Sequence, residues 1–116
     1  MTTAPSPLAL LDGDWYFLGA QTQGCRRIAL LSSGGGEPLG AVCTSRQAAH
    51  TLANGAGLEV LEIRQDDLRA KEEWLEDVLG QGAERLLIDP GEGERQVATE
   101  KALWYILSFK RQTACL

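Results

Sequence analysis

The chain has 116 residues, the size of one globular domain, and this length buries enough surface for one hydrophobic core. Apolar residues make up 44% and charged residues 23%, as in soluble globular proteins and unlike disordered or fibrous ones. The net charge of −5 argues against nucleic acids and anionic membranes as partners, because both require clustered Lys and Arg. No apolar run approaches the roughly 18 residues of a membrane-spanning helix.

Cysteine usage and the N-terminal segment favour a reducing compartment. Cys25, Cys43 and Cys115 form no closely spaced pair, which disfavours both a disulfide framework and a zinc site. The chain opens without the basic and apolar regions of a secretory signal. We therefore expect a cytoplasmic protein with a single domain over residues 1–116, in which residues 1–8 form a flexible lead-in.

The first part of the chain is typical of strands. Aromatic and apolar residues predict strands over residues 15–20, 27–31 and 39–43. A glycine-rich segment over residues 34–40 joins the second of these strands to the third. Its glycine spacing does not match a dinucleotide- or phosphate-binding loop, and no helix follows it directly, so we expect a flexible hairpin loop.

From Thr44 onward, strands alternate with helices. Thr44 and Gln47 fit a capping box, in which the Thr hydroxyl caps the third helical amide, and Thr99 is expected to cap the last helix. The expected elements are a helix ending at Asn54-Gly55, a strand over 58–63, a helix from Asp66-Asp67 to Gly80, strands over 85–88 and 95–98, and a helix over 100–110. The pattern predicts an α/β fold in the order β-β-β-α-β-α-β-β-α, with three helices covering a single mixed sheet of five to six strands.

Cys43 and His50 are the side chains that nucleophilic catalysis would most readily use. Cys43 precedes a predicted helix N-terminus, where a thiol can gain thiolate character, but a buried packing role is favoured for a cysteine at a strand end. His50, the only histidine, lies away from the apolar stripe of its helix and is expected to face solvent. We expect no catalytic constellation, no metal site and no cofactor.

A candidate ligand site lies at the carboxyl ends of the predicted strands. If the strands over 39–43, 58–63 and 85–88 run parallel, these ends share one edge of the sheet. The residues at that edge would be Thr44, Ser45, Asp66, Asp67 and Asp89. Such hydroxyls and carboxylates can bind a divalent cation or a small hydroxylated metabolite, but all of them also fit as helix caps and turn residues, and this second interpretation is favoured.

The last helix has more apolar surface than one buried face requires. The expected inward stripe consists of Ala102, Leu103, Ile106 and Leu107. Trp104 and Tyr105 fall outside this stripe, and Phe109 lies at its margin. Because Trp and Tyr are enriched in binding hot spots, we expect a protein partner here, most simply a second copy in a homodimer. The alternative is that residues 8–11 fold over this face.

Several short motifs resemble a known family. Val42-Cys43-Thr44-Ser45 leads from a strand into a helix, and a later apolar strand ends in Ile88-Asp89-Pro90-Gly91. This arrangement resembles the N-terminal domain of the enhanced serine sensitivity protein family, in which Phe-Thr-Ser and Asn-Pro-Gly occur at these places. The resemblance covers roughly residues 10–107, with Cys43, Gln47 and Asp89 departing from the family's usual residues. It implies a small bacterial α/β domain without an established enzymatic activity, and it carries over no catalytic residue.

The sequence therefore favours a non-enzymatic interaction module that associates with itself through the last helix. The alternative is a small-molecule or metal-ion binder, or a weak enzyme, that uses the edge near Thr44, Asp66 and Asp89. Nucleic-acid binding is the least favoured function, because the net charge opposes it.

Overall fold

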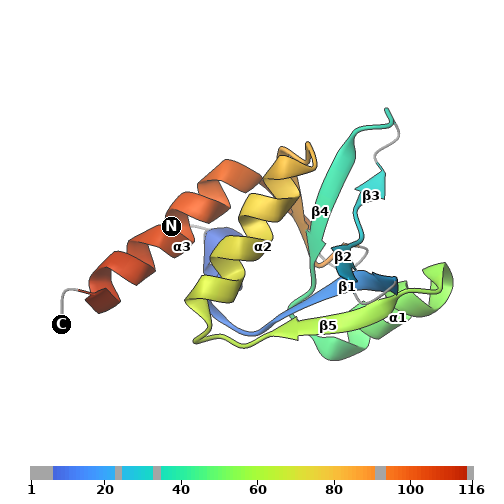
Figure 1. The fold of residues 1–116 in the computed structure, drawn as a ribbon, viewed down its shortest axis with the longest axis horizontal. Coiled ribbons are helices and arrows are strands. Elements are labelled where there is room, and N and C mark those ends of the chain that lie inside the picture. Colours follow the sequence, from blue (N-terminus) through green and yellow to red (C-terminus); the bar gives the residue numbers. More distant parts are fainter. Residues whose placement is uncertain (1–6, 23–24, 33–34, 91–93, 115–116) are drawn as a thin grey trace, which may run out of the picture.

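The computed structural model describes residues 7–22, 25–32, 35–90 and 94–114 (Figure 1). Its elements are, in chain order, the 3₁₀-helix η1 (Pro7–Asp12), β1 (Trp15–Thr22), β2 (Cys25–Ile28), β3 (Leu31–Ser32), β4 (Pro38–Val42), α1 (Arg46–Ala56), β5 (Glu59–Ile63), α2 (Leu68–Gly80), β6 (Arg85–Ile88), β7 (Arg95–Ala98) and α3 (Thr99–Ala114). The predicted mixture of helices and strands is confirmed. Most of the predicted lead-in over residues 1–8 lies outside the described residues.

The strands form two sheets, so the prediction of a single mixed sheet is wrong. In the first sheet, with the order β2-β1-β5, β1 pairs antiparallel with both neighbours. The second sheet has the order β3-β4-β6-β7, in which β4 and β6 are parallel and the other pairs antiparallel. The two sheets meet where Tyr16 and Cys43 exchange backbone hydrogen bonds of 3.0 and 2.7 Å.

The predicted strand over residues 27–31 divides into two strands. β2 ends at Ile28 and pairs with β1, whereas β3 begins at Leu31 and pairs with β4. Between them, the amide of Ala29 still donates to the carbonyl of Leu18 at 2.9 Å. The apolar run predicts one continuous strand, but the chain changes its pairing partner in the middle of the run. This change accounts for the additional strand and the second sheet.

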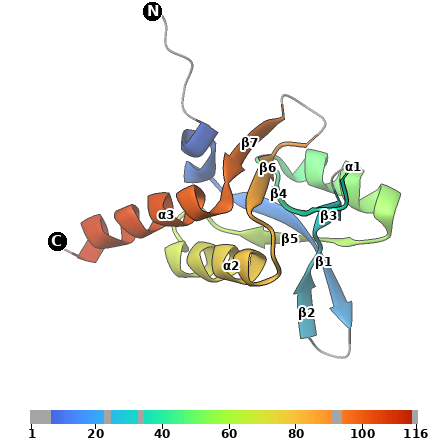
Figure 2. The same cartoon turned by 90° about the horizontal axis from the view of Figure 1, so that it is seen from above.

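The helices cover the first sheet from both sides (Figures 1 and 2). α1 packs against β1 and β5 on one face, while α2 lies over the other face with α3 beside it. Trp74 of α2 is central to this second interface: its ring lies 5.7 Å from that of Trp15 and 5.5 Å from that of Phe17. The core around these rings includes Leu11, Val42, Leu75, Val78, Leu86, Ile88 and Ile106.

Helix α2 buries a different set of residues from the predicted stripe. The helical period of the sequence predicts a buried stripe of Leu68, Leu75, Val78 and Leu79, whereas the structure buries Lys71, Trp74, Leu75 and Val78. Leu68 and Leu79 are half-buried at the two ends of the helix. α2 presses closely on β4 here, because a Cβ atom at Gly40 would lie 2.9 Å from Cγ1 of Val78. Gly40 thus allows the close packing of helix and strand.

The cap of α1 differs from the predicted capping box. Ser45, not Thr44, is the N-cap, and its hydroxyl accepts a hydrogen bond from the amide of Ala48 at 3.2 Å. The helix continues past Asn54-Gly55 and ends at Gly57, which has a φ of 68° and the left-handed conformation that glycine adopts readily. The hydroxyl of Thr99 at the start of α3 donates to the buried carbonyl of Ala83 at 2.9 Å.

Candidate interaction surface on the last helix

One side of α3 carries four residues that we call the outer stripe: Glu100, Trp104, Leu107 and Arg111. Their spacing of four, three and four residues places them on one face of the helix, away from the buried Ala102 and Ile106. Trp104 is 57% exposed, more than any other large apolar side chain among the described residues. Leu107 is half-buried, and Glu100 and Arg111 are exposed. The stripe is therefore an apolar centre between two opposite charges.

The indole of Trp104 is oriented along its own helix. Its Nε1 donates to Oε1 of Glu100, one turn earlier, at 3.5 Å. In both overall views, α3 extends past the two sheets toward its C-terminal end (Figures 1 and 2). The outer stripe consequently lies on a projecting element, where a second protein can reach it.

Tyr105 and Phe109 lie on another side of α3, where Tyr105 contacts η1. The hydroxyl of Tyr105 donates to Oδ1 of Asp12 at 2.7 Å, and the two aromatic rings meet edge to face at 4.9 Å. Desolvation, the hydrogen bond to Asp12 and the charge of that carboxylate raise the pKa of Tyr105 to about 12. Leu11, next to Asp12, is fully buried in the core. The N-terminal segment thus packs against α3 at Tyr105, in line with the alternative for this helix, while Trp104 stays exposed.

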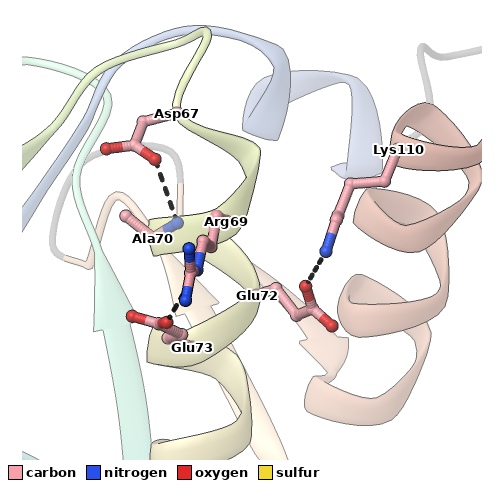
Figure 3. A network of polar contacts seen from close by, with 6 residues as sticks. All are labelled: Asp67, Arg69, Ala70, Glu72, Glu73 and Lys110. Carbon is pink, nitrogen blue, oxygen red and sulfur yellow. Dashed lines mark hydrogen bonds and ion pairs between the residues drawn. The ribbon is translucent and has the colours of Figure 1, made fainter. Parts of the chain in front are cut away.

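The side of α3 that faces α2 is held by an ion pair. Lys110 of α3 pairs with Glu72 of α2 (Figure 3). The neighbouring Glu73 pairs instead with Arg69 on α2 itself, at 3.3 Å. This ion pair involves neither Glu100 nor Arg111, the charged ends of the outer stripe.

The structure brings together two residues of the predicted ligand edge, Thr44 and Asp89. β4 and β6 run parallel, so these residues follow neighbouring strand ends. The amide and hydroxyl of Thr44 donate to Oδ1 and Oδ2 of Asp89, both at 2.7 Å. Asp89 has a φ of 54°, a left-handed conformation that Asp and Asn tolerate better than most residues. Both carboxylate oxygens therefore already accept hydrogen bonds within the chain.

The other residues of the predicted edge act as caps or lie elsewhere. β5 belongs to the other sheet, where β1 lies between β5 and the end of β4, so the three strand ends do not form one edge of a single sheet. As a result, Asp66 and Asp67 follow a strand of the other sheet and do not belong to the edge at Thr44. Asp67 caps α2 by accepting a hydrogen bond from the amide of Ala70 at 3.1 Å, which Figure 3 shows, and Ser45 caps α1.

Cys43 and His50 lie as the sequence analysis expects. The side chain of Cys43 is 2% exposed, and burial, with the nearby charge of Asp89, raises its pKa to about 11. The thiol is consequently protonated at neutral pH, opposite to the state that a nucleophile requires. His50 is exposed on α1. Cys115 lies outside the described residues.

Lys71, a lysine buried in the core, is not among the candidate residues that the sequence suggests. Its side chain is 1% exposed, and Nζ donates to the carbonyls of Leu11, Gly13 and Gln65 at 3.0, 2.9 and 3.2 Å. Burial lowers its pKa, against the opposing charges of Asp12, Asp14 and Asp66. The sequence does indicate its burial, because Lys71 stands four residues before Leu75 and therefore lies on the apolar face of α2.

A largely apolar hollow of about 420 Å³ lies between η1, α2 and α3, beside Lys71. Its lining includes Leu68 and Phe109. The three hydrogens of the Lys71 ammonium are already donated to the three backbone carbonyls, which leaves none for a ligand in this hollow. The arrangement fits a structural role for Lys71.

No protein-family model matches the chain, and a search of the curated proteins found no match. The resemblance to the enhanced serine sensitivity family stays a prediction. In the described part of the chain, no helix has the length and apolar character needed to cross a membrane. Over the same residues, no three His, Cys, Asp or Glu side chains are grouped so that they could hold a metal ion.

Proposed function

We propose that this chain is a cytoplasmic, non-enzymatic interaction module that associates with itself through the outer stripe of α3. The observation that carries the proposal is the 57% exposure of Trp104 on a helix that projects from the domain. Covering a large exposed aromatic side chain with a partner removes apolar surface from water, which makes association more favourable. The half-buried Leu107 and Leu103 extend the apolar surface from Trp104 toward the core.

The size of the outer stripe predicts a weak association. The stripe spans about 16 Å along the helix axis, at 1.5 Å per residue. Stable interfaces bury about 800 Å² on each partner, which exceeds what one helical stripe of this length contributes alone. We therefore expect a dimer that dissociates on dilution into the low micromolar range.

Sedimentation velocity on three proteins tests the proposal. Trp104→Asp places a charge at the centre of the outer stripe and should give a monomer at concentrations where the wild type is a dimer. Leu10→Asp is the matched control, since Leu10 on η1 is the next most exposed large apolar residue, at 39%. This control should leave the dimer intact. Dimers of equal strength in all three proteins would refute the role of α3.

The ligand edge receives less support from the geometry. Thr44 already donates two hydrogen bonds to the carboxylate of Asp89. Asp66 and Asp67 follow a strand of the other sheet. A metabolite or cation there would have to share both carboxylate oxygens of Asp89 with the two hydrogen bonds of 2.7 Å from Thr44. The outer stripe of α3, by contrast, presents an exposed apolar side chain, Trp104, to a partner.

A further inference from the structure

We propose that two copies of α3 pair antiparallel about a two-fold axis, and this inference rests on the proposed self-association. The outer stripe is symmetric in its chemistry: Glu100 stands four residues before Trp104, and Arg111 stands four residues after Leu107. Read from either end, the stripe runs from a charged residue through two apolar ones to a residue of opposite charge. A surface of this kind is complementary to a copy of itself turned end to end.

A two-fold interface makes each contact occur twice. With the axis passing between residues 105 and 106, Glu100 lies opposite the partner's Arg111 and Trp104 lies opposite the partner's Leu107. The apolar side chains then cover one another at the centre, and an ion pair closes each end. Parallel pairing would instead set Glu100 against the partner's Glu100 and Arg111 against the partner's Arg111, so like charges disfavour it.

The surroundings of Glu100 leave room for this pairing. Glu100 borders a hollow of about 750 Å³ next to β7, which Gln96, Val97 and Lys101 also line. In the antiparallel arrangement the partner's Arg111 comes to this end of the stripe. At the other end, the C-terminal part of α3 projects beyond the sheets, so the body of the domain does not block the approach of a second helix (Figure 2).

Charge reversal tests the direction of pairing through the dimer dissociation constant, measured by sedimentation equilibrium at moderate ionic strength. In an antiparallel dimer, Glu100→Arg and Arg111→Glu each turn two attractive contacts into repulsive ones, and the dissociation constant should rise about tenfold. The double variant Glu100→Arg/Arg111→Glu exchanges the charges and should restore the wild-type value. Lys101→Glu, a charge reversal beside the stripe, is the control and should change little.

The outcomes separate this inference from the proposed function. In a parallel dimer, each single reversal exchanges one like-charge contact for another, so unchanged dissociation constants in both single variants would overturn the antiparallel arrangement. Failure of the double variant to recover would overturn it as well. If Trp104→Asp still abolished the dimer in those cases, self-association through α3 would be supported and only the antiparallel arrangement of the two helices would be rejected. A wild type that is monomeric throughout would overturn both.

Discussion

Trp15 and Lys71 donate hydrogen bonds to the same acceptor, the backbone carbonyl oxygen of Leu11. Nε1 of Trp15 lies 2.9 Å and Nζ of Lys71 lies 3.0 Å from this oxygen, and the ammonium is 5.1 Å from the centre of the Trp15 ring. Because Trp15 begins β1 and Lys71 belongs to α2, these two hydrogen bonds connect the end of η1 to both elements. The same ammonium binds Gln65 in the turn before α2. Two stretches distant in sequence, residues 11–15 and 65–71, are thus joined at one buried cation.

Removing this cation should strongly destabilise the fold. Lys71→Met keeps most of the side-chain volume but leaves the carbonyls of Gly13 and Gln65 without this donor. We expect the free energy of unfolding to fall by about 3 kcal/mol, measured by urea denaturation. Lys101→Met, at an exposed site on α3, should change it by less than about 0.5 kcal/mol. Equal effects of the two substitutions would contradict the role assigned to Lys71.

The two tryptophans of the core differ in how their indole nitrogens are satisfied. Trp15 donates to Leu11, whereas Nε1 of Trp74 is buried without a hydrogen-bond partner in the described part of the chain. Trp15→Phe and Trp74→Phe remove the same atoms from the same cluster, so the difference between them isolates the hydrogen bond. Trp15→Phe should cost about 1 kcal/mol more than Trp74→Phe in denaturant unfolding. A larger loss for Trp74→Phe would contradict this expectation.

The buried thiol of Cys43 predicts a specific loss of stability at high pH. Its pKa rises from 9.0 to about 11 on folding, so between these values the native state keeps a proton that the unfolded state has lost. Stability should therefore be complete below pH 9 and decline toward pH 11, by roughly 2–3 kcal/mol in total.

Comparison with Cys43→Ala isolates this effect, measured as the unfolding free energy from pH 8 to about 11. The lowered pKa of Lys71 acts in the opposite direction, because stability from that group rises with pH up to its ordinary value of 10.5. The raised pKa of Tyr105 acts in the same direction as Cys43, at higher pH. Both contributions are common to the two proteins and cancel in the difference. Identical pH profiles would show that Cys43 is not the group concerned.

Asp89 should tolerate replacement by Asn far better than by Ala. Asn adopts the left-handed conformation readily, and its amide can still accept from the backbone and donate to the hydroxyl of Thr44. Asp89→Asn should cost less than about 1 kcal/mol, whereas Asp89→Ala loses both hydrogen bonds and strains the backbone, at about 2–3 kcal/mol. Thermal unfolding of the two variants checks the order, which the opposite ranking would contradict.

Local signals in the sequence explain what was predictable of the fold. Asp67 caps α2 as expected, because a carboxylate before an apolar-periodic segment can bond the amide of Ala70 without help from the rest of the chain. The outward position of Trp104 likewise follows from the period of its own helix. Such features depend on residues within one turn of each other.

The errors concern contacts between distant segments. β5 pairs with β1 through Ile63 and Trp15, and nothing in the apolar pattern of either strand reveals that partner. The apolar pattern likewise does not reveal that the chain changes its pairing partner from β1 to β4 between Ile28 and Leu31. The covering of Tyr105 by η1 also depends on a contact across the whole chain, to Asp12. This is why the sequence predicted one sheet and grouped Tyr105 with Trp104.

The central claim is that the exposed face of α3 is covered by a second copy, and the molar mass of the wild-type protein tests it most directly. Light scattering during size exclusion, over a dilution series from near-millimolar to low micromolar loading, should show the mass of two chains that falls toward one on dilution. The mass of a single chain at every concentration would contradict the claim, because Trp104 would then remain in water in the functional state.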